Sequence, residues 1–126
     1  MPDDATPEPA LDPAIVAELR HAERACGNPE FIAQLIALFR ANAPIRLARI
    51  REAVVARDGS TLGHTAHTLK SNCAMLGATK LAQMCARLEA FGDSGSLEGA
   101  AGLLGDADAE LTLVLAALEE LLALDQ

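Results

Sequence analysis

The fold can be worked out from the stretch STLGHTAHTLKSNCAMLG (Ser60–Gly77), because its apolar residues follow a helical spacing. At about 100° per residue, one face of a helix collects side chains spaced 4, 3, 4 and 3 residues apart, namely Leu62, Ala66, Leu69, Cys73 and Leu76. Ser60 is suited to cap the start of this helix, and Gly77 to end it. The pattern predicts an amphipathic helix that buries one face in a core.

Helices are also indicated on both sides of this stretch. A cap residue followed by proline marks two helix starts, Asp12–Pro13 and Asn28–Pro29. Pro44 is predicted to end one helix and begin the next, because proline lacks the N–H that a helix interior needs. Gly59 is predicted to stop this second helix. The helices expected besides the central one cover residues 13–26, 29–43, 44–58, 78–93 and 96–124.

The connections between these segments are only a few residues long, so consecutive helices are expected to pack antiparallel. The composition agrees, since 51% of the residues are hydrophobic while Trp and Tyr are absent, which favours an aliphatic helical core. The predicted fold class is all-α, an antiparallel up-and-down four-helix bundle with one or two short N-terminal lead-in helices. Residues 1–12 are predicted to form a disordered, acidic, proline-rich tail, and residues 13–126 a single helical bundle domain.

The charge and the chain start exclude several classes of protein. A net charge of −8 argues against a nucleic-acid binder. The acidic start MPDDATPEPA is unlike a signal peptide, and no apolar run approaches the roughly 18 residues of a membrane span. A cytoplasmic location is therefore expected, with Cys26, Cys73 and Cys85 as reduced thiols.

The face of the central helix opposite its apolar stripe carries an unusual histidine. His67 lies about 140° from the centre of the stripe, so it is expected to face solvent. Its neighbours at −4, +3, +4 and +7 are Gly63, Lys70, Ser71 and Ala74, three of which are among the smallest residues. A solvated helix face normally carries long polar side chains, so this histidine is predicted to be left accessible to a second protein.

An accessible imidazole next to one cation suits phosphoryl transfer. A ring nitrogen that is unprotonated at neutral pH can attack phosphorus. Lys70, at i+3, is placed to offset the charge of a phosphoryl group on His67. The helix has no paired carboxylates for a metal, so the protein is expected to need no cofactor of its own, and Mg²⁺ is expected on the partner.

The alternatives for His67 are an ordinary surface histidine and a metal ligand. His64 and His67 are spaced i, i+3 on one face, as in some metal-binding helices. Further ligands are missing, because Cys73 points to the predicted core, so no metal site is predicted. His64 is interpreted as plain surface, at the rim of a docking face.

The segment AHTLKSNCAMLGATKLAQMCARLE (Ala66–Glu89) resembles the signature of histidine phosphotransfer (HPt) domains, which relay phosphoryl groups in multistep two-component signalling. The positions that match the pattern are Ala66, His67, Leu69, Lys70, Gly77, Leu81, Cys85, Leu88 and Glu89. The resemblance implies a four-helix bundle in which His67 is the phosphoacceptor, Lys70 assists it, and Gly77 ends the helix beside the site. One position departs from the pattern, since Ser71 stands where the family usually has glycine.

The resemblance also implies partners. The expected protein is a monomeric phosphocarrier, not an enzyme by itself, that moves a phosphoryl group between receiver-domain aspartates of a hybrid histidine kinase and a response regulator. Gly63, His64, Ser71, Ala74 and Gly77 would form the access and docking face around His67. The alternatives are the phosphoacceptor domain of a chemotaxis-type kinase, and a helical protein-binding module that is not phosphorylated.

Overall fold

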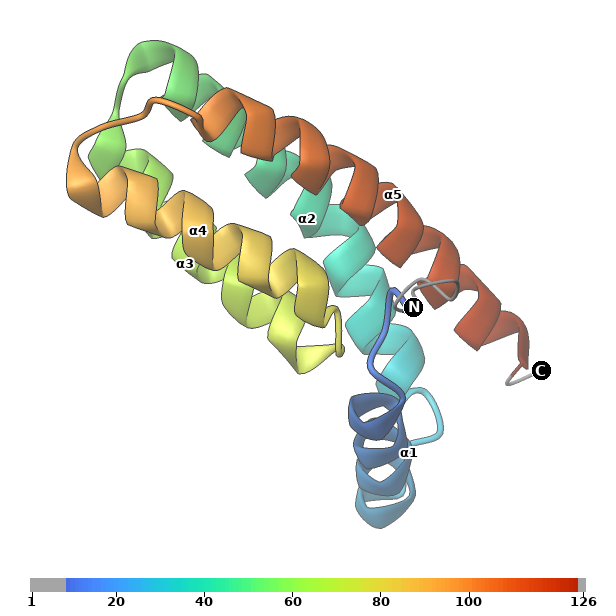
Figure 1. Cartoon of the computed structure of the whole chain (residues 1–126). Coiled ribbons are helices and arrows are strands. Elements are labelled where there is room, and N and C mark those ends of the chain that lie inside the picture. Colours follow the sequence, from blue (N-terminus) through green and yellow to red (C-terminus); the bar gives the residue numbers. More distant parts are fainter. Residues whose placement is uncertain (1–8, 125–126) are drawn as a thin grey trace.

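The computed structural model describes residues 9–124, and these residues form five α-helices (Figure 1). The helices are α1 (Pro13–Cys26), α2 (Phe31–Ala56), α3 (Gly59–Met75), α4 (Thr79–Ser94) and α5 (Ala100–Leu124). Helices α2 to α5 pack in a ring, each against the next and α5 back against α2, while α1 lies at one end of the bundle. The predicted four-helix bundle with one lead-in helix is therefore confirmed.

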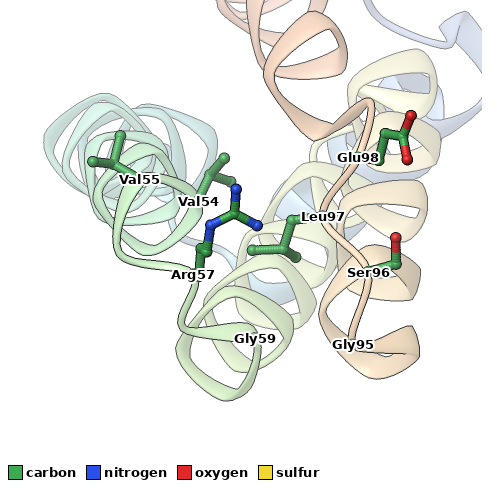
Figure 2. Close-up of a pocket in the computed structure, with 8 residues that line it drawn as sticks. All are labelled: Val54, Val55, Arg57, Gly59, Gly95, Ser96, Leu97 and Glu98. Atoms are coloured by element: carbon green, nitrogen blue, oxygen red, sulfur yellow. The ribbon is translucent and has the colours of Figure 1, made fainter.

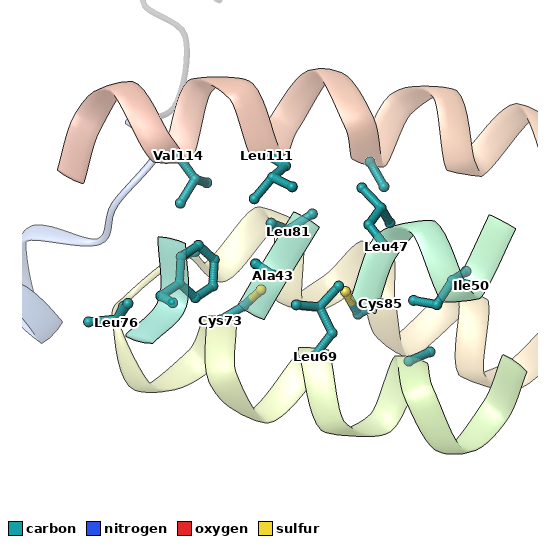
Figure 3. Close-up of a cluster of buried hydrophobic side chains, with 14 of the residues drawn as sticks. Ala43, Leu47, Ile50, Leu69, Cys73, Leu76, Leu81, Cys85, Leu111 and Val114 are labelled. Atoms are coloured by element: carbon teal, nitrogen blue, oxygen red, sulfur yellow. The ribbon is translucent and has the colours of Figure 1, made fainter. Parts of the chain in front are cut away.

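The core of the bundle is aliphatic and draws on all four long helices (Figure 3). All five residues of the predicted stripe on α3 are buried, namely Leu62, Ala66, Leu69, Cys73 and Leu76. Cys73 meets Cys85 of α4 in this core, and the pKa of the Cys73 thiol is raised by that neighbour and by burial. Cys73 therefore stays a neutral thiol and acts as a small hydrophobic residue, as the sequence predicted.

The predicted helix break at Pro44 is wrong, because α2 continues through it for 26 residues. The buried residues before and after the proline lie on one continuous stripe, Ile32, Ile36, Phe39, Ala43, Leu47, Ile50 and Ala53. Breaking the helix would take half of that stripe out of register. Pro44 and Arg40 are both exposed, so water can bond the Arg40 carbonyl that loses its helical partner.

Replacing Pro44 by alanine is therefore expected to stabilise the protein by about 1–3 kcal/mol, because the missing helical hydrogen bond is restored. Urea unfolding followed by circular dichroism measures the shift. Pro13→Ala is the matched control, since Pro13 occupies the first turn of α1, where no N–H is required. A lower urea midpoint for Pro44→Ala than for the wild type would contradict this account.

Helix α2 is the one helix within residues 9–124 that is long and apolar enough to cross a membrane by length and composition, although Arg40 and Arg46 interrupt its apolar run, as expected. Its place in the bundle accounts for part of its apolar character, because seven of its residues lie in the core, while Leu38, Ile45 and Val55 are exposed. Two of its arginines form ion pairs with α5, Arg40 with Glu119 at 2.8 Å and Arg51 with Asp108.

The turn between α2 and α3 differs in detail from the prediction. Arg57, not Gly59, takes the left-handed conformation that ends α2, with φ of 56°. Asp58, not Ser60, caps α3, and its side chain accepts a hydrogen bond from the Thr61 N–H at 3.1 Å. Gly59 is thus already inside α3, where it packs against α4.

Part of the predicted N-terminal tail is ordered against the bundle. Ala10 and Leu11 pack on the core, and the Asp12 N–H donates to the Gly77 carbonyl at 2.7 Å. Asp12 also caps α1 as predicted, with its carboxylate accepting from the Ala14 N–H at 2.9 Å. The prediction of a disordered tail is therefore wrong for residues 9–12, and its remainder, residues 1–8, lies outside the described residues.

Candidate functional site

His67 lies on the outer face of α3, away from the core. Its side chain is 58% exposed, as the stripe geometry predicted. The ring is nevertheless held, because Nδ1 lies 3.0 Å from Oε2 of Glu89 on α4. The imidazole is thus open to a second molecule while its orientation is fixed by a carboxylate.

Glu89 uses its second oxygen to hold Lys70. The Lys70 ammonium donates to Oε1 at 2.9 Å, so one carboxylate bridges the histidine and the lysine across the α3–α4 interface. The Glu89 side chain is only 23% exposed, which limits its freedom to turn. We call the arrangement of His67, Lys70 and Glu89 the carboxylate clamp.

The clamp keeps Glu89 ionised. The pKa of Glu89 lies below its ordinary value, foremost because of the hydrogen bond from Lys70, with desolvation opposing this and His67 adding to the lowering. A carboxyl group with a lowered pKa stabilises the fold at pH values above its unfolded pKa, and this contribution is lost as the pH falls through the lowered folded value. Glu89 is therefore ionised at neutral pH, and its protonation in acid weakens its hold on Lys70 and His67.

An ionised carboxylate can only accept hydrogen bonds, and this decides the tautomer of a neutral His67 ring. The proton must sit on Nδ1, where it is donated to Glu89, and Nε2 is left with the lone pair. No described residue makes a hydrogen bond to Nε2. The site therefore presents a single, defined nucleophilic nitrogen to solvent.

The other residues predicted around His67 separate into two groups. His64, Ser71 and Ala74 are exposed on α3, as expected for an accessible face. The Ser71 hydroxyl, at the position that departs from the family pattern, donates to the His67 carbonyl at 3.3 Å. In this position it adds little bulk around the ring.

Gly63 and Gly77 are buried, so their assignment to the exposed docking face was wrong. A Cβ on Gly63 would lie 3.2 Å from Oδ1 of Asp93, which shows that this glycine faces α4. Gly77 has φ of +82° and a Cβ there would meet Ile15 at 3.0 Å, so it closes α3 and receives the lead-in segment. Both glycines support helix packing beneath the site.

Glu89 is the functional residue that the sequence patterns did not single out, although it matched the family pattern. Its signal was present, because His67 lies 10 residues before Gly77 and Glu89 lies 12 residues after it. In an antiparallel pair joined at that turn, the two residues fall at nearly the same height. Glu89 also follows the buried Leu88 directly, which places it at the edge of the interface with α3.

One hollow borders the clamp, and a groove that no clamp residue lines lies between α2 and α3. Within residues 9–124 no group of three or more His, Cys, Asp or Glu side chains is arranged to hold a metal ion. A hollow of about 350 Å³ beside Lys70 has Ala74, Ala82 and Ala86 among its lining residues. A groove of about 270 Å³ between α2 and α3 has Leu38 and Met75 among its lining residues.

A more voluminous hollow, of about 810 Å³, lies at the far end of the bundle (Figure 2). It is formed where α2 turns into α3 and where α4 leads into α5, and its lining includes Val55, Arg57, Leu97 and Glu98. No residue of the carboxylate clamp lines it. Its volume therefore has no bearing on the chemistry of His67.

Comparisons with known proteins agree with this geometry. The sequence matches the Hpt domain family over residues 34–124, which covers α3, α4, α5 and most of α2. The fold matches the crystal structure of histidine-containing phosphotransfer protein B (HptB) from Pseudomonas aeruginosa PAO1, with a TM-score of 0.80 and 28% sequence identity, over 90% of this chain and 95% of that one. No match was found among curated protein sequences. On the family match and this structural likeness, the chain belongs to the Hpt domain family.

Proposed function

We propose that this protein is a phosphocarrier whose His67 accepts a phosphoryl group from one receiver domain and passes it to another. The observation that carries the proposal is the carboxylate clamp, which leaves Nε2 of an exposed imidazole as the reactive atom and keeps a lysine ammonium beside it. The resemblance to HptB supports the same assignment. Proteins of this kind are signalling carriers and not kinases.

In the proposed step, the Nε2 lone pair attacks the phosphorus atom of an aspartyl phosphate on the receiver. The N–P bond forms as the P–O bond to the aspartate breaks, and the carboxylate leaves with the bonding electrons. The His67 ring keeps its Nδ1 proton and becomes positively charged, and the Glu89 carboxylate at 3.0 Å balances that charge. Because no proton has to move, the same arrangement serves the return transfer to a second aspartate.

Lys70 is proposed to stabilise the phosphoryl group once it is on the ring. Its ammonium lies one helical turn from His67, and among residues 9–124 its only ion-pair partner is Glu89. A phosphoryl group on Nε2 carries more negative charge than the carboxylate and competes for the same ammonium. The Mg²⁺ that assists the transfer is proposed to come with the receiver.

Receiver domains are proposed to dock over α2 and α3 next to His67. The groove there exposes two large hydrophobic side chains, Leu38 at 62% and Met75 at 55%. Arg46 lines the same groove and places one positive charge there, on a chain whose net charge is −8. An apolar surface beside a positive charge fits the acidic surroundings of a receiver aspartate. We propose that the carrier acts as a monomer, because one exposed face serves both partners. We also propose that it works in the cytoplasm.

Incubation with a phosphorylated receiver domain and Mg²⁺ tests the proposal. Label is expected to appear on this chain in an acid-labile, base-stable form, as for phosphohistidine. A non-phosphorylated binding module would take up no label at all. The phosphoacceptor domain of a chemotaxis-type kinase would be labelled by its kinase and ATP, and not by receivers.

Substitutions of Glu89 test the role of the clamp in transfer. Glu89→Ala removes the group that fixes the tautomer, and a loss of about tenfold in transfer rate is expected. Glu89→Gln is expected to be slower still, because the amide oxygen must face the Lys70 ammonium and the NH₂ group must then face Nδ1. That amide donates to Nδ1 and moves the ring proton to Nε2, which blocks the attacking atom.

Transfer rates measured by rapid quench check this rank order of wild type, Glu89→Ala and Glu89→Gln. Glu119→Gln is the matched control, since Glu119 pairs with Arg40 on the exposed surface away from the site. It removes the same charge without touching the ring. Equal rates for all four proteins would show that the clamp has no part in transfer.

A further inference from the structure

Helices α3 and α4 touch backbone to backbone at three glycines. A Cβ on Gly92 of α4 would lie 2.6 Å from the Gly59 carbonyl oxygen and 2.7 Å from the Gly63 nitrogen, both on α3. A Cβ on Gly59 would lie 2.9 Å from the Gly92 carbonyl oxygen. These distances are below any real carbon contact, so the observed helix spacing requires glycine here. We call the contact between Gly59, Gly63 and Gly92 the glycine contact.

The glycine contact lies one helical turn from the carboxylate clamp on both helices. Gly63 precedes His67 by four residues, and Gly92 follows Glu89 by three. The two helices run antiparallel, so these offsets point the same way along the bundle, a distance of about 5 Å. The separation of α3 from α4 at the clamp is thus set by the contact next to it.

The clamp has little capacity to absorb a change in that separation. Both oxygens of Glu89 are engaged, one at 3.0 Å from His67 Nδ1 and the other at 2.9 Å from Lys70 Nζ. Turning the carboxylate to keep one partner lengthens the bond to the other. A hydrogen bond weakens steeply once its atoms separate by about 0.5 Å beyond these values.

We propose that Gly92 is a positioning residue, which sets the α3–α4 spacing that lets Glu89 hold His67 and Lys70 together. The inference rests on the proposed function for its consequence, phosphoryl transfer, but the contact between Glu89 and the His67 ring can be measured without transfer. Gly92 touches none of the reacting atoms. Its effect on the chemistry passes through Glu89.

The direct test is Gly92→Ala in the full chain. The state of the His67 ring is read from its ¹⁵N chemical shifts, and transfer from a phosphorylated receiver is measured alongside. The ring is expected to change from one tautomer, with the proton on Nδ1, to a mixture of both. Transfer is expected to slow by about tenfold, as for Glu89→Ala.

A double-mutant comparison separates positioning from a general loss of structure. If Gly92 acts through Glu89, Gly92→Ala should slow transfer little further in a Glu89→Ala background, where the clamp is already absent. An equal additional loss in both backgrounds would overturn the proposal. So would a folded Gly92→Ala protein whose His67 ring keeps the wild-type tautomer.

Two further variants keep the test decisive. Gly63→Ala is the fallback if Gly92→Ala does not fold. It is the milder change, because its Cβ meets the movable Asp93 carboxylate at 3.2 Å. It should give the same change of the His67 ring to a smaller extent. Gly102→Ala is the matched control in α5, since nothing lies within 4 Å of a Cβ there. A wild-type chain that takes no label from receivers would refute the proposed function, while the ring spectra would still decide the role of Gly92.

Discussion

The variant His67→Gln is expected to accept no phosphoryl group from any receiver domain. The glutamine amide can occupy the same exposed position on α3 and can still bond to Glu89, but its nitrogen has no available lone pair for attack on phosphorus. Since His67 is 58% exposed, the substitution should leave the thermal stability nearly unchanged. The expected result is therefore complete loss of label on a folded protein.

Labelling with a phosphorylated receiver and Mg²⁺, followed by denaturing electrophoresis at alkaline pH, measures this outcome. His21→Gln is the matched control, because His21 is exposed on α1, which lies at the end of the bundle. It should be labelled like the wild type. Label retained on His67→Gln, at any other residue, would show that the site is misassigned.

The sequence predicted the central part of the fold well because one stripe was unambiguous. The apolar residues of α3 fall on a single face, and Gly77 closes the helix with positive φ, so the helix, its buried side and its exposed histidine could all be derived. Local signals of this kind need no knowledge of what packs against them. The exposure of His67 followed directly from its angle to the stripe.

Pro44 was misjudged because local propensity and core packing compete there. A proline in a helix interior costs about 3 kcal/mol, and this favoured a break. Burial of Ala43, Leu47 and Ile50 on the same stripe as the residues before the proline outweighs that cost. The proline can be read directly from the sequence. That the residues on both of its sides share one buried face outweighs the proline only when the other helices pack against that face.

Glu89 and the glycine contact could not be ranked from the sequence because both depend on how two helices pair. A glutamate at a helix edge is ordinarily a solvated residue, and only the α3–α4 spacing brings it to 3.0 Å from the His67 ring. Gly59 was interpreted as a helix stop, while its place in the structure is a close approach to Gly92. Residues that act across an interface are the part of the site that one-dimensional patterns miss.

Leu69→Ala is expected to destabilise the folded protein strongly. Leu69 is fully buried, and its side chain points into the core between α3, α4 and α2 (Figure 3). Truncation of a buried leucine removes apolar contact and leaves a cavity, at a cost of about 2–5 kcal/mol. This is a large share of the roughly 5–15 kcal/mol that holds a domain of this size folded.

Urea unfolding at constant pH measures the loss, and Leu113→Ala is the matched control, because Leu113 of α5 is 58% exposed and should cost less than about 0.5 kcal/mol. Equal midpoints for the two variants would contradict the assignment of the core.

A second readout links the core to the site. Since Leu69 anchors the turn of α3 that carries both His67 and Lys70, the folded fraction of Leu69→Ala should also hold Glu89 less firmly and transfer more slowly. Transfer at the wild-type rate, corrected for the folded fraction, would show that α3 keeps its position against α4 without this side chain.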